Sequence, residues 1–100
     1  MFASVIAFDL HLPLPASLKE KRAVITPILE GARNRHRVAV SEVGHQDSLR
    51  RAELAFASVG SSETQVREVL DAVERFVWSF PEVEVVHSWR RWLEDDEDDR

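Results

Sequence analysis

The stretch FASVIAFDLHLPLPASLKE, residues 2–20, contains a strand, a break and a helix start in direct succession. Every second residue from Ile6 to Leu12 is large and apolar, which is the period of a strand with one buried face. Two prolines follow and end the strand. Ser17 and Glu20 then have the spacing of a capping box, so a helix is expected to begin at Ser17.

The same reading extends to the rest of the chain. The first helix is expected to end within the basic run Arg33–Arg37, and Pro27 inside it predicts a kink. A second helix is predicted between Ser62 and Phe80, where apolar residues recur at intervals of three and four. Further strands are expected over residues 36–43, 51–59 and 82–92, and the last should place Val83, Val85, His87 and Trp89 on one face.

The resulting order is βαββαβ. Two right-handed crossovers with both helices on one face of the sheet give a ferredoxin-like α+β sandwich. The expected strand order is 4-1-3-2, with all neighbouring strands antiparallel. We expect a single domain over residues 1–93, followed by an acidic, disordered tail over residues 94–100.

Composition narrows the classes of function. The chain has 100 residues, no cysteine and a formal net charge of −5. The tail carries six acids and one arginine, so the domain itself is close to neutral, and the tail either is solvated or covers a basic patch. No disulfide, thiolate metal site or cysteine nucleophile is possible. No membrane span or signal peptide is recognised, and a cytoplasmic protein is expected.

The predicted topology brings three distant segments to one edge of the sheet. These segments are Ser17–Arg22, Gly44–Arg51 and Phe80–Glu82. The first has cations in the opening turns of a helix, where the helix dipole disfavours them, so the edge could bind an anion. Alternatively, these cations pair with Asp47, Glu42 or Glu82.

Four short runs carry a resemblance to a known family. They are SLKEKR at 17–22, RNR at 33–35, SEVGHQD at 41–47 and RAEL at 51–54. Together they resemble the YlxP-like family of small bacterial proteins, over about residues 2–92. The resemblance implies a ferredoxin-like α+β domain of unknown function, with a link to translation or ribosome maturation. The family commonly has an acidic residue where this chain has Gly44.

The two most distinctive of these runs lie at the predicted shared edge, which we therefore expect to be the binding surface. Positive charge and hydrogen-bond donors would come from five side chains: Lys19, Lys21, Arg22, His45 and Arg50. Gln46 and Asp47 would orient these side chains or a partner. Neutral replacement of Lys21 and Arg22 should weaken binding without unfolding the domain.

Catalysis is not expected. The sequence offers His45 and Asp47 as a remote basis for a hydrolase-type enzyme, but turn residues of these types usually cap turns. Antiparallel pairing should put His11 beside Glu84, so the histidines form no metal site. No cofactor is expected, since the chain has no glycine-rich phosphate loop.

A non-enzymatic interaction module linked to translation or ribosome maturation is therefore the expected function. The open face of the sheet should be apolar, which favours a protein partner or a homodimer through the sheet face or an edge strand. Six small residues would line this face: Val5, Ala7, Ala39, Ala55, Ala57 and Val59. The alternative is a small RNA-contacting factor that uses the shared edge or Arg33, Arg35 and Arg37.

Overall fold

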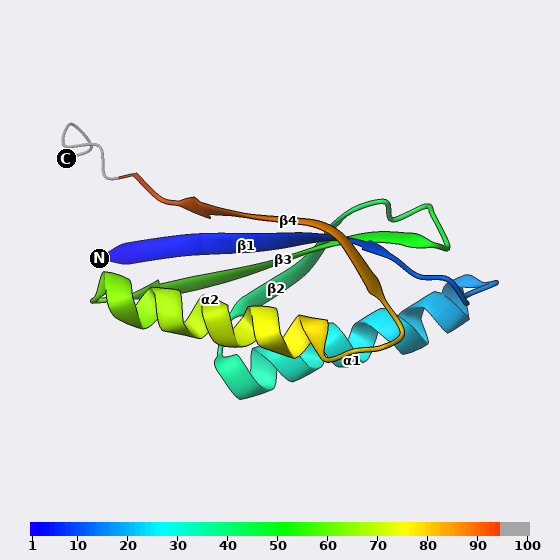
Figure 1. Ribbon diagram of the computed structural model, residues 1–100, viewed down its shortest axis with the longest axis horizontal. Helices are drawn as coiled ribbons and strands as arrows, with labels where there is room; N and C mark the ends of the chain where they lie inside the picture. Colours follow the sequence, from blue (N-terminus) through cyan, green and yellow to red (C-terminus); the bar gives the residue numbers. More distant parts are fainter. Residues whose placement is uncertain (95–100) are drawn as a thin grey trace.

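Six elements follow one another in the predicted order in the computed structural model, which describes residues 1–94 (Figure 1). Their bounds are β1 Phe2–His11, α1 Leu18–His36, β2 Ala39–Gly44, β3 Arg51–Gly60, α2 Glu63–Trp78 and β4 Glu84–Trp92. The predicted acidic tail lies outside the described residues, apart from Glu94. Neither helix of the described part is both long and apolar enough to cross a membrane.

The sheet has the order β2-β3-β1-β4, and every neighbouring pair of strands is antiparallel. This is the predicted 4-1-3-2 order counted from the other edge. Both helices lie against the same face, so the sheet has one covered face and one open face (Figure 1). The prediction of a ferredoxin-like βαββαβ fold is confirmed.

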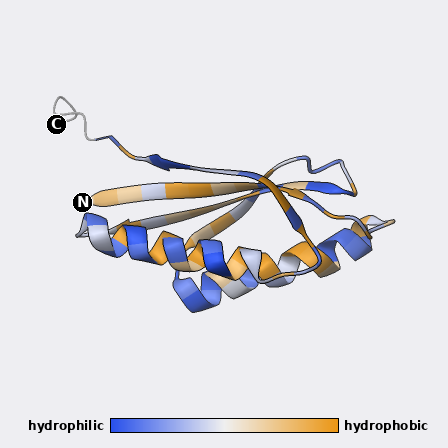
Figure 2. Ribbon diagram, in the orientation of Figure 1, coloured by the Kyte–Doolittle hydropathy of each residue, from blue (hydrophilic) through white to orange (hydrophobic). Residues whose placement is uncertain are grey.

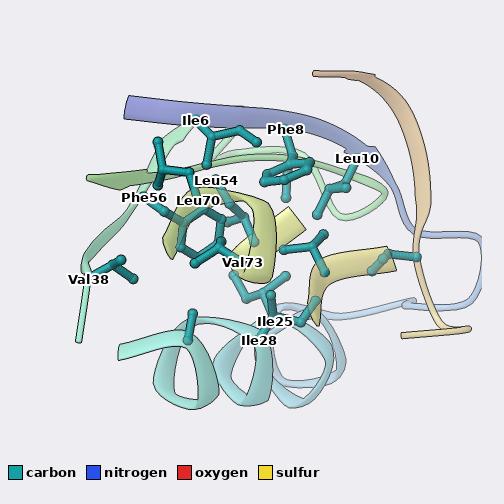
Figure 3. Packing of buried hydrophobic residues seen from close by; sticks show 14 of the residues in the cluster. Ile6, Phe8, Leu10, Ile25, Ile28, Val38, Leu54, Phe56, Leu70 and Val73 are labelled. Carbon is teal, nitrogen blue, oxygen red and sulfur yellow. The ribbon is translucent and has the colours of Figure 1, made fainter. Parts of the chain in front are cut away.

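The core lies between the sheet and the two helices (Figure 3). The rings of Phe8 and Phe56 meet edge to face in its middle, with their centroids 5.8 Å apart. Side chains of Ile25 and Leu70 reach this layer from α1 and α2 and are almost completely buried. Burial of each such side chain stabilises the fold by roughly 1.5–3 kcal/mol. In Figure 2 the helices alternate between hydrophobic and hydrophilic residues, as two helices with one buried face should.

Helix α1 begins where the capping box places it. The Ser17 hydroxyl accepts from the Glu20 amide at 3.1 Å, and the Glu20 carboxylate accepts from the Ala16 amide at 2.7 Å. The helix continues through Pro27, which is exposed, so water can reach the carbonyl that the proline leaves unpaired. The helix ends at Arg37 in the left-handed region, with φ at 56°.

The predicted face of β4 is wrong at one point. A β-bulge interrupts its pairing with β1, so that Asp9 is opposite His87 but Leu10 is opposite Val85. The extra residue turns Val85 toward the core and leaves His87 on the open face. Strict alternation predicted Val85 and His87 on the same face. The bulge could not be predicted, because it adds a residue to the strand without any change in the apolar pattern.

Candidate functional site

The start of α1 and the β2–β3 hairpin meet at one end of the molecule, as the topology predicts (Figure 1). The Lys21 ammonium donates to the carbonyl of His45 at 2.9 Å and to that of Ser48 at 2.6 Å. The Leu12 amide donates to the Arg50 carbonyl at 2.9 Å. Strand β4 starts opposite His11, so the loop before it approaches the same end. We call this region the hairpin end.

Lys21 is buried at the hairpin end and is only 2% exposed. Besides the two carbonyls, its ammonium lies 3.0 Å from Oε2 of Glu42, whose side chain is 10% exposed. Two of the three ammonium donors hydrogen-bond to the carbonyls, while Glu42 Oε2 compensates the charge as an ion pair without a hydrogen bond. The expectation that Lys21 offers its charge to a partner is therefore wrong, and pairing with Glu42 is the alternative that holds. Neutral replacement of Lys21 would leave a buried carboxylate unpaired and destabilise the domain.

The other predicted site residues lie on the surface of the hairpin end. Gln46 closes the hairpin by donating from Nε2 to the Glu42 carbonyl at 3.0 Å. Among the lysines and arginines predicted for this site, three make no ion pair within 4 Å to any residue of 1–94: Lys19, Arg22 and Arg50. Exposed positions are also taken by Asp47 and His45. The hairpin end therefore presents long, positively charged side chains around the turn that Gln46 closes.

The His45 ring faces Asp9 on β1. Its Nε2 lies 3.9 Å from Asp9 Oδ1, and the backbone at His45 is left-handed, with φ at 59°. Arg51 donates to both oxygens of Asp9, at 2.8 and 2.7 Å. The carboxylate beside His45 is thus that of Asp9, and it is already compensated by a guanidinium. The hydrolase-type alternative required Asp47 in this place.

Asp9 and Arg51 are site residues that the sequence analysis missed. Asp9 is the only charged residue of the otherwise apolar or neutral strand β1, apart from His11 at its end. Its side chain belongs to the open face, because it alternates with the buried Phe8 and Leu10. A single carboxylate on an apolar strand is the signal that could have identified it.

The remaining histidines of the open face have separate neighbours. His11 Nδ1 lies 2.6 Å from Glu84 Oε1, as the predicted strand pairing requires. His87 stacks on Trp89, with centroids 5.5 Å apart and planes at 21°. Across the described residues, no group of three or more histidine, aspartate or glutamate side chains is arranged to hold a metal ion.

Gly44 allows Glu53 to approach β2 closely. A Cβ atom at Gly44 would collide with Oε1 of Glu53, which occupies the space of the missing side chain. An acidic side chain at this position would compete with that carboxylate for the same space. In this chain, Glu53 therefore supplies a negative charge next to position 44.

The open face is lined by small apolar side chains, as predicted, except that Ala7 is buried opposite Trp89. Val5 is 40% exposed and Val59 is 68% exposed, and Ala55 and Ala57 lie between β1 and β2. Two shallow hollows follow this surface. Their lining residues include Val5, Ala39, Ser41, Ala55 and Ala57 in one hollow, and Ala3, Ala57, Arg91 and Leu93 in the other.

Comparison with known proteins agrees with this geometry. Uncharacterized protein YlxP of Bacillus subtilis (strain 168) is 42% identical over 77 residues, covering 77% of this chain and 84% of the relative. The de novo designed protein Foldit4 matches with a TM-score of 0.54 at 12% identity, over 94% of this chain and 99% of the design. A dimeric protein of unknown function with a ferredoxin-like fold, from Bacteroides fragilis NCTC 9343, matches with a TM-score of 0.51 at 12% identity, over 94% and 95% of the two chains.

The two structural matches show the fold alone, because their sequence identity is low. The family model "Protein of unknown function (DUF503)" matches residues 4–90, which is most of the domain. The runs at 17–22 and 41–47 that predicted a YlxP-like protein lie within this match. The chain belongs to the DUF503 family.

Proposed function

We propose that the chain is a non-enzymatic interaction module, and that the open face of the sheet binds a protein partner. The observation that carries the proposal is that the helices cover only one of the two faces of the sheet. Both helices cover one face, while Val5, Ala57 and Val59 leave the other face apolar and uncovered (Figure 1). Monomeric proteins rarely expose apolar patches larger than a few hundred Å².

The polar groups at the hairpin end support a binding role over a catalytic one. Arg51 holds Asp9 in an ion pair, and the carbonyls of His45 and Ser48 hold Lys21 together with Glu42. A general base needs an acceptor that is free to take a proton from a substrate. The charges of Asp9, Lys21 and Glu42 are therefore compensated within the domain, which supports the proposal of a binding role.

A second candidate function is RNA contact at the hairpin end. Lys19, Arg22 and Arg50 are exposed there and make no ion pair within residues 1–94. Such cations can contact phosphates, and the affinity then falls steeply with salt. The proposed link to translation or ribosome maturation shares one test with this candidate: co-sedimentation with ribosomes, repeated at rising salt and after ribonuclease treatment.

Affinity recovery of the tagged chain tests the open face directly. Ala57→Arg places a long cation in the middle of the face, and Ala23→Arg places the same side chain on the exposed surface of α1. We expect proteins that copurify with the natural chain and with Ala23→Arg to be lost with Ala57→Arg. Val59→Arg, at an exposed position near the strand end, should give the same loss if Ala57→Arg is poorly folded. Identical recovery with all variants would refute the proposal.

A further inference from the structure

We propose that residues 94–99 of one copy of this chain bind the hairpin end of a second copy, so that copies associate head to tail. We call residues 94–99 the acidic run. The contact leaves the open face free, so the inference goes beyond the proposed function and does not depend on it. Its basis is the charge at the two ends of the molecule and the distance between them.

The hairpin end presents cations that have no partner in their own domain. Lys19 and Arg22 are exposed on the first turns of α1, and Arg50 is exposed in the hairpin that Lys21 ties to those turns. None of the three makes an ion pair within 4 Å to a residue of 1–94. These cations are therefore available to an anionic segment from outside the domain.

The carboxylates of the hairpin end leave these cations uncompensated. Four of them are engaged elsewhere: Glu42 with Lys21, Asp9 with Arg51, Glu84 with His11 and Glu20 with the Ala16 amide. Three more make no ion pair in the described part of the chain and thus lie more than 4 Å from the three cations: Asp47, Glu53 and Glu82. Charge compensation at contact distance has to come from another molecule.

The acidic run begins at the opposite end of the sheet. Strand β4 ends there at Trp92, and the Leu93 amide donates to the Ala3 carbonyl at 2.9 Å. Six acids follow in direct succession, from Glu94 to Asp99. Like charges at this spacing repel one another, and pairing with cations relieves the repulsion.

The cations around the last turn of chain before the acidic run supply little of this compensation. Arg90 is held by two carboxylates of α2, and Arg67, which lies over the Trp92 ring, is held by a third. Arg91 makes no ion pair within residues 1–94, but one guanidinium compensates only part of the charge of six carboxylates. The acidic run therefore keeps a large uncompensated charge.

The acidic run is too short to reach the hairpin end of its own copy. Ala3 and His11 are eight steps apart on β1, a span of about 26 Å at about 3.3 Å per residue. Helix α1 begins beyond that end of β1 (Figure 1). The five residues after Glu94 extend at most about 18 Å. Contact between the acidic run and the three cations therefore requires two copies.

Such a contact joins unlike surfaces, so it does not close into a symmetric dimer. Every added copy brings a further hairpin end and a further acidic run, and copies add in a row. Salt screens contacts between exposed charges, with a Debye length of about 30 Å at 0.01 M and about 3 Å at 1 M. Association is therefore expected at low ionic strength and should disappear in high salt.

Two full-length variants remove the two halves of the contact. The first neutralises the acidic run by E94Q, D95N, D96N, E97Q, D98N and D99N, and the second neutralises the cations by K19Q, R22Q and R50Q. In sedimentation velocity at about 0.01 M salt, the natural chain should exceed the mass of a monomer. Each variant should associate about tenfold more weakly or not at all. Removal of six negative charges lowers the general repulsion between copies, so a nonspecific effect would have the opposite sign.

The matched control R33Q/R35Q/R67Q removes three cations from the other end of the two helices and should associate like the natural chain. An equimolar mixture of the two variants gives the sharpest result, since each keeps the half of the contact that the other lacks. The mixture should form a complex of two chains and nothing larger. Three results overturn the inference: a natural chain that is monomeric at low salt, a variant that associates like the natural chain, or a mixture that stays monomeric.

Ala57→Arg separates this contact from the open face. Residue 57 lies in the middle of β3, away from both charged ends, so the substitution should leave association unchanged. Loss of association with Ala57→Arg assigns it to the open face and overturns the head-to-tail contact. The proposed function is judged by the copurifying proteins alone, so the two proposals can fail separately.

Discussion

Lys21→Met removes the buried ammonium while keeping a side chain of similar length. Glu42, which is 10% exposed, then loses the charge that compensates it at 3.0 Å. The carbonyls of His45 and Ser48 lose their donor as well. Removal of one partner from a buried ion pair usually costs about 3–5 kcal/mol of unfolding free energy. A small domain has only about 5–15 kcal/mol in total, so this one substitution should bring it close to unfolding.

Urea denaturation followed by tryptophan fluorescence measures this loss, since Trp78, Trp89 and Trp92 come from two different elements. In a domain of this size, a loss of about 3 kcal/mol lowers Tm by about 12 °C or more. Lys19→Met is the matched control, because Lys19 is exposed on the same turn of α1, and its effect should stay within about 0.5 kcal/mol.

The double variant Lys21→Met/Glu42→Leu separates the ion pair from the carbonyl contacts. Without either charge, no buried carboxylate is left unpaired, so the double variant should be more stable than Lys21→Met alone. The unfolding free energy that the double variant does not recover reports the loss of the Lys21 donor at the carbonyls of His45 and Ser48. This loss should be about 1–3 kcal/mol for each carbonyl that water cannot reach. Two results would refute the proposed role of Lys21 as a buried, charge-compensated contact between α1 and the hairpin. One is a loss of unfolding free energy below about 1 kcal/mol for Lys21→Met, and the other is a double variant that is no more stable than Lys21→Met.

Substitutions at three further positions probe the core, a helix cap and the surface. Phe56→Ala should cost about 3–5 kcal/mol in chemical denaturation, because the ring is fully buried against Phe8, and a smaller loss would mean that the core collapses to fill the cavity. Ser17→Ala removes the acceptor for the Glu20 amide and should cost about 1 kcal/mol, while Ser17→Asp should retain most of the stability. Arg51→Met should cost no more than about 1 kcal/mol, since both partners of its pair with Asp9 are partly exposed, and a larger loss in the same assay would contradict that view.

Most of the fold could be predicted from local patterns. The alternation in β1, the capping boxes at Ser17 and Ser62 and the apolar spacing of α2 each depend on neighbouring residues only. Once the order βαββαβ is known, strand handedness and antiparallel pairing leave few arrangements, and the contact between His11 and Glu84 follows. The meeting of α1 with the hairpin follows for the same reason.

Details that depend on side-chain packing could not be predicted in this way. The bulge in β4 changes which face Val85 occupies, and no change in the apolar pattern marks it. Lys21 and Lys19 look alike in sequence, and both stand in the first turns of a helix. Only the position of the hairpin over α1 buries one of them and leaves the other exposed.

Periodicity and chain direction establish the elements, their order and the apolar character of both sheet faces, so these properties can be predicted from the residues alone. The pairing of charged groups, in contrast, depends on tertiary packing. This packing joins Lys21 to Glu42 and Arg51 to Asp9. Electrostatic partners depend on distances of a few ångströms and on burial, and packing between residues far apart in the chain sets both.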